Sequence, residues 1–303
     1  MSAPRRGDPA RAARLAVGVV GAGRVGSVLG AALARAGHAV VAASGVSRES
    51  VRRAGRLLPG VPVLPVPDVV ARAGMVLLAV PDDALADLVR GLADTGVWRP
   101  GQLICHTSGA HGLAVLEPAV RRGALPLALH PVMTFAGRPE DMARLDGVAF
   151  GATAPEALRP VAEALVLEMG GEPVWVPDRA RALYHAALVT GANHLVTLVN
   201  ESVDLLRGAG VDNPARVLGP LLEAALDNAL RLGDGALTGP VSRGDAGTVA
   251  GHLATLAEHA PDSVAAYVAM ARRTADRALA SGRLTPQRAE ALLDVLASKE
   301  RAT

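Results

Sequence analysis

The sequence has almost no lysine and almost no cysteine. Its 31 basic residues are nearly all arginine, and Lys299, near the C-terminus, is the only lysine. A Schiff base and a lysine acid or base are therefore excluded from the folded body. The single Cys105 excludes an intrachain disulfide and a multi-cysteine metal site. It lies in an apolar run, so we interpret it as core packing in a cytoplasmic protein and predict no metal site.

Aromatic residues, excess charge and long apolar runs are also scarce. Only 2% of the residues are aromatic and the formal net charge is +2, with basic residues spread along the chain, so there is no electrostatic footprint for nucleic acid. No uninterrupted apolar run approaches the roughly 20 residues of a membrane span, which predicts no membrane segment. Residues 1–14 are short and basic and are predicted to be a loose tail.

What the chain does have is apolar bulk and a regular alternation. Half of its 303 residues are apolar, enough for two domains with separate cores. Strand-like and helix-like segments alternate through residues 15–177, which predicts an α/β, doubly wound, mostly parallel Rossmann sheet. The expected strands are LAVGVV from Leu15, HAVVAA to Ser44, VPVLPV near Val63, MVLLAV from Met75, QLICHT from Gln102, ALPLALH from Ala124, and shorter ones near Phe150 and Trp175.

A glycine-rich turn follows the first strand and opens a helix: Gly21, Ala22, Gly23, Arg24, Val25, Gly26. The first glycine permits the tight turn, the second lets the backbone approach a pyrophosphate, and the third lets helix and strand pack closely. The helix N-terminus then faces the anion. This position within the alternating pattern predicts a dinucleotide site rather than a turn without a ligand.

The end of the second strand indicates which dinucleotide. An acidic residue there would bind an adenosine ribose and exclude a 2'-phosphate, but this chain has Ser44, Ser47 and Arg48. A hydroxyl and a guanidinium suit a phosphate, so we predict NADP(H) rather than NAD(H). The alternative is that Arg48 is only a solvated charge at a helix start.

Polar residues cluster where the fourth, fifth and sixth expected strands end, and in such sheets ligands bind beyond those carboxyl ends. Val80 and Pro81 are predicted to border the cofactor, and Pro81 with Asp82 to form a turn and helix cap. His106 and Ser108 either hydrogen-bond a substrate or tie their loop together. His130 is better placed for chemistry because Pro131 fixes the turn after it.

Residues 178–303 are predicted to form a helical domain. Helices are expected from Asp178 to about Arg207, and after Asn213-Pro214, Asp245, Pro261 and Thr285-Pro286. Between two of them, Arg243 could clamp a substrate carboxylate, with Asp245 as a helix cap or an orienting partner. A capped turn with a surface ion pair is the alternative.

One stretch of the first of these helices, LYHAALVTGANHLV, is unusual. Its length and periodicity predict a buried helix, yet it carries Tyr184, His185, Asn193 and His194, and buried polar groups need partners or a use. At 100° per residue, Asn193 lies about 80° round a regular helix from His185. Tyr184 is expected to face the core or a partner subunit, and His194 to be structural.

The order of motifs, VGVVGAGRVG, VSRES, LAVPDDALADLV, HTSGA, LHPVMTF, YHAALVTGANHLV and LTGPVSRGDAGTVAGHL, resembles a Rossmann-like oxidoreductase family whose C-terminal half is a domain of unknown function. The resemblance spans about residues 15–270 and extends to ketopantoate reductase, pyrroline-5-carboxylate reductase, prephenate dehydrogenase and the 6-phosphogluconate dehydrogenase group. It implies a nicotinamide-dependent oxidoreductase that dimerises through its C-terminal helices. His185 stands near the place of the hydroxyacid dehydrogenases' catalytic lysine, Asn193 follows eight residues later, and His130-Pro131-Val132-Met133 partly matches the prephenate dehydrogenase turn.

The predicted activity is hydride transfer between NADP(H) and a small carboxylated carbonyl compound, as in ketopantoate reductase. His185 is the first candidate acid, because imidazole titrates near neutral pH, and His130 is the second. Asn193 would flank the same substrate, with His106, Ser108, Arg243 and Asp245 as further substrate contacts. The alternatives are an imine reductase of the pyrroline-5-carboxylate type and a non-catalytic NADP-binding module.

Overall fold

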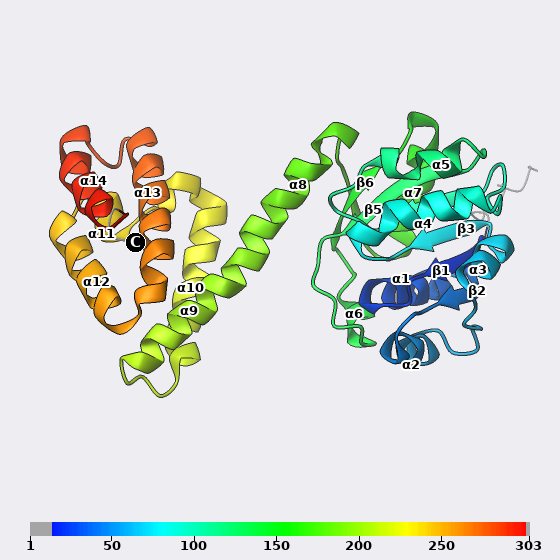
Figure 1. Cartoon of the computed structure of the whole chain (residues 1–303), viewed down its shortest axis with the longest axis horizontal. Helices are drawn as coiled ribbons and strands as arrows, with labels where there is room; N and C mark the ends of the chain where they lie inside the picture. Colours follow the sequence, from blue (N-terminus) through cyan, green and yellow to red (C-terminus); the bar gives the residue numbers. More distant parts are fainter. Residues whose placement is uncertain (1–13, 301–303) are drawn as a thin grey trace, which may run out of the picture. The chain divides into compact units, whose positions relative to one another are not determined.

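The computed structural model describes residues 14–300, with side chains to residue 297. It divides into two compact units, a Rossmann unit that ends at Val189 and a helical unit that begins at Thr190. Both units appear in Figure 1. The predicted tail, residues 1–14, lies almost wholly outside the described residues. The predicted domain boundary at residue 178 falls earlier than the division by contacts, because the first turns after the sheet pack with the Rossmann unit.

A seven-stranded sheet forms the centre of the Rossmann unit, in the order β2-β1-β3-β4-β5-β6-β7. All neighbours are parallel except β5 and β6, which are antiparallel. The doubly wound, mostly parallel sheet predicted from the alternation is thus confirmed. The strands are β1 (Ala16–Val20), β2 (Ala39–Ser44), β3 (Met75–Leu78), β4 (Leu103–His106), β5 (Leu125–Pro131), β6 (Ala149–Thr153) and β7 (Glu172–Trp175).

Helices cover both faces of this sheet. One core layer packs α1 (Arg24–Arg35), α2 (Arg48–Leu57) and α7 (Arg159–Glu168) on side chains such as Val17, Val19 and Leu77. The other packs α3 (Val66–Arg72), α4 (Asp82–Asp94) and α5 (Glu117–Val120) on the alternate positions, such as Val76 and Leu78. The short α6 (Glu140–Ala143) follows β5. Consecutive strand residues point to opposite faces of the sheet, and helices cover both faces. Almost every residue of a strand must therefore be apolar.

The strand predicted near Val63 is wrong. Val63 makes only an isolated bridge to Ala43, and no ladder forms there. Pro62 and Pro65 flank it, and proline has no N–H to donate to a sheet. β1 pairs with β2 on one side and with β3 on the other, so the order of the strands reverses between β1 and β3. Ligands bind at such a switch point in open α/β sheets.

The helical unit begins within a π-helical turn, Val189–Asn193, that joins α8 (Arg181–Leu188) to α9 (His194–Gly208). Its other helices are α10 (Pro214–Leu232), α11 (Gly239–Arg243), α12 (Ala246–His259), α13 (Val264–Ala280) and α14 (Pro286–Glu300). Asn213 and Asp245 accept hydrogen bonds from the backbone at the starts of α10 and α12, as N-caps do. Aliphatic side chains of α12, α13 and α14 form its core.

The stretch LYHAALVTGANHLV is not buried within the chain, contrary to the prediction. Leu183 is 75% exposed and Val196 is 61% exposed. By length and composition the segment Asp178–Gly208 is apolar enough to cross a membrane, and none of its most apolar window is buried. Interruptions such as Tyr184, His185 and Asn193 hid this from a search for unbroken apolar runs. The same polar groups are costly in hydrocarbon, so its exposed surface is better suited to protein contacts.

Candidate active site

The glycine turn after β1 is built as the motif predicts. Gly21 has φ of +90°, and a Cβ there would lie 2.5 Å from the carbonyl oxygen of Ala79 and 3.2 Å from Val80. A Cβ on Gly26 would collide with the Gly21 carbonyl oxygen. Gly23 faces open space and is the N-cap of α1 without a side-chain cap bond. The free N–H groups at the start of α1 therefore border a gap that suits a pyrophosphate.

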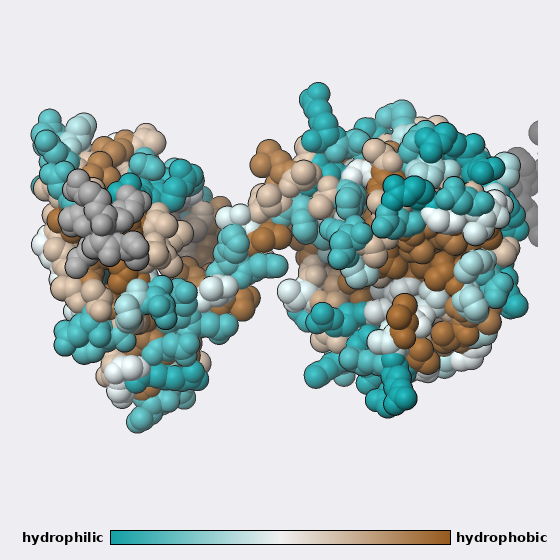
Figure 2. Space-filling model, in the orientation of Figure 1, coloured by the Kyte–Doolittle hydropathy of each residue, from teal (hydrophilic) through white to brown (hydrophobic). Residues whose placement is uncertain are grey.

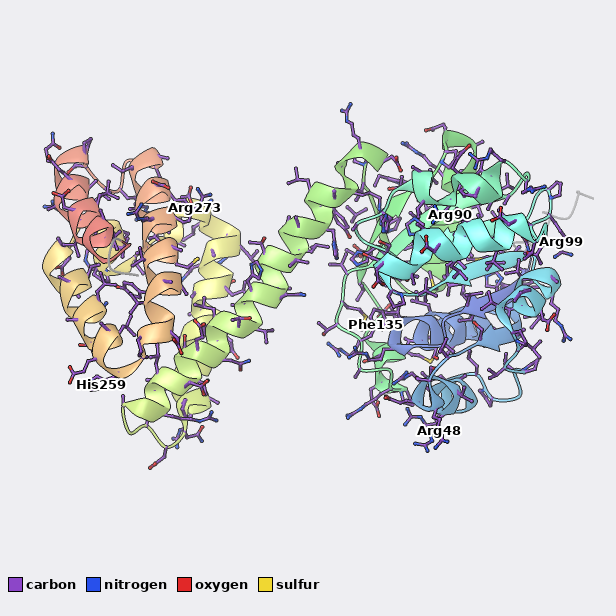
Figure 3. All side chains as sticks on the ribbon, in the orientation of Figure 1. Arg48, Arg90, Arg99, Phe135, His259 and Arg273 are labelled. Carbon is purple, nitrogen blue, oxygen red and sulfur yellow. The ribbon has the colours of Figure 1, made fainter. Side chains whose placement is uncertain are left out.

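Ser44 and Ser47, predicted near the adenosine ribose, both have structural bonds. The Ser44 hydroxyl accepts from the N–H of Gly21 at 3.2 Å, and so ties the end of β2 to the glycine turn. The Ser47 hydroxyl accepts from the N–H of Ser50 at 3.1 Å and caps α2. Arg48 is the first residue of α2. Its side chain is exposed (Figure 3) and makes no ion pair with any residue that the structure describes.

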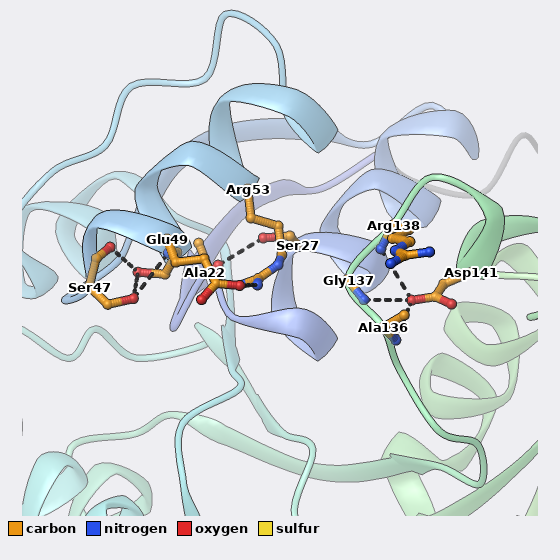
Figure 4. A network of polar contacts seen from close by, with 10 residues as sticks. Ala22, Ser27, Ser47, Glu49, Arg53, Ala136, Gly137, Arg138 and Asp141 are labelled. Atoms are coloured by element: carbon orange, nitrogen blue, oxygen red, sulfur yellow. Dashed lines mark hydrogen bonds and ion pairs between the residues drawn. The ribbon is translucent and has the colours of Figure 1, made fainter.

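A loop after β5 closes against the same region. The buried carboxylate of Asp141 accepts from the N–H groups of Ala136, Gly137 and Arg138, at 2.8, 2.7 and 3.3 Å (Figure 4). A Cβ on Gly137 would meet the side chains of Arg53 and Arg24. Arg53 is buried, pairs with Glu49 (Figure 4), and keeps a buried Nε without a partner. The loop thus packs against the side chains of Arg53, from α2, and Arg24, at the start of α1.

The two candidates after β4 are both committed to their own loop. His106 is fully buried, and its Nε2 hydrogen-bonds the Gly112 carbonyl oxygen at 3.1 Å. The Ser108 hydroxyl accepts from the N–H groups of Ala110 and His111, at 3.2 and 3.0 Å. The structure thus shows hydrogen bonds that tie this loop, and contact of His106 or Ser108 with a substrate stays a prediction.

Three rings converge where β4 and β5 end. His130, from the end of β5, hydrogen-bonds the Tyr184 hydroxyl through Nδ1 at 2.9 Å. Its ring lies edge-on to the rings of Tyr184 and His185, with centroids 5.7 and 6.0 Å apart. A Cβ on Gly109 would lie 2.6 Å from His185 and 3.0 Å from Nε2 of His130. Only glycine at this position leaves both histidine rings where they are.

A buried arginine supports this cluster. Arg181 is 1% exposed and donates to the carbonyl oxygens of Ser108 and Gly151 and to the hydroxyl of Thr153, at 2.6, 3.2 and 3.0 Å. It joins the loop after β4 to β6 and the start of α8. Its guanidinium carbon lies 5.9 Å from the centre of the Tyr184 ring. The cluster therefore has a fixed positive charge beside it.

Burial and this charge set the protonation of the cluster. Burial, helped by the charges of Arg181 and His185, lowers the pKa of His130 from 6.5 to about 4. Burial also lowers the pKa of His106, to about 3. Burial raises the pKa of Tyr184, which remains a phenol. At neutral pH His130 is uncharged, so Nδ1 accepts from the Tyr184 hydroxyl and Nε2 carries the proton.

Three predicted site residues belong to the helical unit and remain predictions. Asn193 ends the π-helical turn and is exposed, and the turn changes the helical phase, so the 80° derived for a regular α-helix does not hold. Arg243 is exposed at the end of α11. The Asp245 carboxylate accepts from the N–H and the hydroxyl of Thr248, which is the predicted capping role. His194 is exposed.

Sequence reasoning missed Tyr184, Arg181 and Gly109 as parts of the cluster. Scarcity was the usable signal for Tyr184, because the chain has only two tyrosines. Arg181 carried no signal, since it is one of many arginines and its burial comes from the fold. Gly109 follows Ser108 in a loop, where glycine is ordinary.

The residues present fit a dinucleotide. The gap beside Gly23, the uncapped start of α1 and the orphaned Nε of Arg53 are what a phosphate-bearing ligand would use. Along the sheet edge, His130 lies three strands from the glycine turn, about 14 Å at the usual strand spacing. The fold and its glycine turn are those of the class of dinucleotide-binding Rossmann proteins.

Comparison with known proteins agrees with this class. Residues 1–131 match a Rossmann-like domain, and residues 148–274 match DUF2520, a domain of unknown function. The chain therefore carries a Rossmann-like domain followed by a DUF2520 domain, which is the arrangement that its motifs resemble. No curated protein matches it in sequence.

Several solved structures share the fold across most of the chain. A Bacteroides fragilis protein, provisionally described as an NADP oxidoreductase, has 22% identity and a TM-score of 0.72, covering 87% of this chain and 98% of that one. An imine reductase of Myxococcus stipitatus in complex with NADP+ has 17% identity and a TM-score of 0.63, covering 86% and 94%. A reductive aminase of Aspergillus terreus with NADPH and ethyl levulinate has 18% identity and a TM-score of 0.60, covering 89% and 95%.

Proposed function

We propose that the protein is an NADP-dependent oxidoreductase that reduces a C=O or C=N bond of a small organic substrate beside Gly109. The observation that carries the proposal is the convergence of His130, Tyr184 and His185 on the carboxyl edge of the sheet that holds the glycine turn. The bound nicotinamide would supply the hydride. The chain must then hold the substrate and deliver one proton.

The proton route follows from the hydrogen bond between Tyr184 and His130. Nε2–H of neutral His130 donates to the oxygen or nitrogen on which negative charge develops, while Nδ1 receives the Tyr184 proton. Arg181 stabilises the phenolate that results, and Tyr184, being half-buried, regains a proton from solvent. His185 was the first candidate from the sequence, but His130 has the hydrogen-bonded partner, so we now place His130 first and keep His185 beside the substrate.

The proposal has two versions, which differ in the type of substrate. A carboxylated carbonyl compound needs a cation, and Arg181 is already committed to backbone carbonyls, so Arg243 is the predicted partner for the carboxylate. The imine version does not require a carboxylate on the substrate, and the likeness of fold to an imine reductase and a reductive aminase supports this version. Nε2–H of His130 can donate to the oxygen or the nitrogen of either bond.

The test is NADPH oxidation with matched 2-oxo acids, the corresponding ketones without a carboxylate, and cyclic imines. Turnover of the oxo acids alone, lost in Arg243→Met, supports the carbonyl version, and turnover of cyclic imines supports the other. His130→Asn should abolish turnover while leaving the dissociation constant for NADPH unchanged in a fluorescence titration. Tight NADPH binding without turnover of any of these compounds would favour a non-catalytic NADP-binding module.

We further propose that the protein is a homodimer through α9 and α10. Large apolar side chains are exposed along both helices, including Leu230 at 79%, and Figure 2 shows apolar residues along α8 and α9. The exposed residues are Leu195, Val196, Leu198, Leu205, Val217, Leu221, Leu226, Leu230 and Leu232. A row of large exposed aliphatic side chains along two helices is typical of a protein–protein contact surface.

Charge on α10 favours a second copy over a lipid surface. The helix carries two basic residues, Arg216 and Arg231, and two acidic residues, Glu223 and Asp227, whereas a membrane-binding face is mainly basic. A face that carries both signs can pair with itself about a twofold axis. Light scattering should give twice the chain mass, and Leu226→Glu with Leu230→Glu should give a monomer. A monomeric wild type at micromolar concentration would contradict the proposal.

A further inference from the structure

A separate cavity of about 420 Å³ lies wholly within the helical unit. This volume is in the range of about 300–1,000 Å³ usual for small-molecule sites. Its walls come from α9, α11, α12 and α13, and most of the lining surface is apolar. The larger lining side chains are Leu198, Leu205, Leu256, Met270, Glu201, His252 and Tyr267.

The second tyrosine of the chain lines this cavity and repeats the pairing made by the first. The hydroxyl of Tyr267 hydrogen-bonds Nδ1 of His252 at 2.9 Å, with the two rings edge-on and their centroids 5.9 Å apart. Burial raises the pKa of Tyr267, which therefore stays protonated and donates to His252. The phenol oxygen keeps its lone pairs as acceptors on the cavity wall.

Glu201 gives the cavity its charge. The residue is partly buried on α9 and makes no ion pair or hydrogen bond with any residue that the structure describes. Neither lysine nor arginine lines the cavity. Asp204, one turn further along α9, is paired with Arg207. A carboxylate that is partly removed from water and lacks a counter-charge attracts a cation.

The remaining polar groups do not offset this preference. The hydroxyls of Ser202, Thr238, Ser263 and Thr274 carry no charge. Those of Ser202 and Thr274 donate to the carbonyl oxygens of Leu198 and Met270, at 2.8 and 2.9 Å. An anionic ligand would face Glu201 without a counter-charge. A ligand that donates N–H bonds and carries an apolar group matches both Glu201 and the aliphatic walls.

We propose that this cavity binds an organic ammonium ion with an apolar body, its nitrogen at Glu201 and Tyr267 and its body against Leu256 and Met270. This site is independent of the reduction proposed for the Rossmann unit, since all its lining residues lie in the helical unit. Calorimetry of the whole protein without NADPH, with 2-phenylethylammonium as the probe, tests it apart from any activity.

Matched probes and variants separate charge from shape. We expect 2-phenylethylammonium to bind, 2-phenylethanol to bind at least about tenfold more weakly, and 3-phenylpropanoate not to bind. Glu201→Gln should weaken ammonium binding about tenfold and Tyr267→Phe a few-fold, whereas Glu290→Gln, at an exposed position of α14 outside the cavity, should leave it unchanged. In protein with labelled methionine methyl groups, the Met270 signal should shift on binding.

Each contrary result overturns the proposal. Equal binding of the alcohol and the ammonium ion, or full binding by Glu201→Gln, would remove the role of charge. If the ammonium ion does not bind to the folded dimer, the second copy closes this cavity, and the cavity is no ligand site. A Met270 signal that does not move while heat is released would place binding elsewhere.

Discussion

Acidification should unfold the Rossmann unit by charging two buried histidines. The folded pKa values of His130 and His106 are about 4 and about 3, against an ordinary 6.5. Because both are lowered, the unfolded chain binds more protons between these limits. The stability contribution is therefore complete above about pH 6.5 and is lost as the pH falls toward the folded values.

The magnitude follows from the shift. A lowering of about 2.5 units for His130 corresponds to roughly 3 kcal/mol, and His106 loses a similar amount between pH 6.5 and 4. Together these losses are comparable with the roughly 5–15 kcal/mol by which most domains are stable. We expect the free energy of unfolding to fall by about 1.4 kcal/mol per pH unit for each histidine near pH 5.

Tryptophan fluorescence can follow this unit alone, because Trp98 and Trp175 both belong to it. Urea unfolding at pH 7, 6, 5 and 4.5 gives the slope of stability against pH for wild type and for His130→Gln. The variant should lose about half of the histidine-dependent slope, while His259→Gln, an exposed histidine on α12 (Figure 3), should match the wild type. An unchanged slope in His130→Gln would refute the assignment of a neutral, buried His130.

Three further results are expected. Tyr184→Phe should lower kcat for the reduction at least about tenfold without changing NADPH affinity, as measured by stopped-flow kinetics and fluorescence titration, because the phenol donates the proton that His130 passes on. Equal kcat values would contradict the relay. Gly109→Ala should cost about 10²-fold in kcat, since its Cβ displaces His130 and His185. Gly91→Ala, where a Cβ meets nothing within 4 Å, is its control. Asp141→Ala should lower the free energy of unfolding of the Rossmann unit, measured in urea, by about 3 kcal/mol, because three backbone N–H groups lose their acceptor. Asp87→Ala, which changes an exposed side chain of α4, should have little effect.

Much of the Rossmann unit was readable from local pattern. The apolar runs at β1, β3 and β5 and the glycines at Gly21 and Gly26 are needed wherever a parallel sheet is covered on both faces and a helix begins close to a strand. The prolines around Val63 also indicate, from the sequence alone, that N–H donors are missing there, and this outweighs the apolar character of the stretch. The start of α10 at Pro214 and that of α12 after Asp245 were correct because caps are local.

The site was only partly predictable, because side chains far apart in sequence meet there. His130 was a candidate from its place after a strand, but its hydrogen bond to Tyr184 joins residues 54 positions apart. Whether Tyr184 faces β5 or solvent depends on the direction in which α8 runs from the sheet. Arg181 lies three residues before Tyr184 and is buried only because Ser108, Gly151 and Thr153 surround it.

The sequence by itself determined the fold class, the dinucleotide turn and the absence of lysine chemistry, because each depends on residue type, period or short spacing. Only the tertiary structure showed which polar residues lie together. Ser108 ties its own loop and Asp245 caps α12, whereas Tyr184 and Arg181 lie beside His130. The tertiary structure also exposed the stretch around Leu183 that the pattern predicted to be buried. An apolar face in the sequence shows that burial is favourable, but only the packed chain shows whether its own residues provide it.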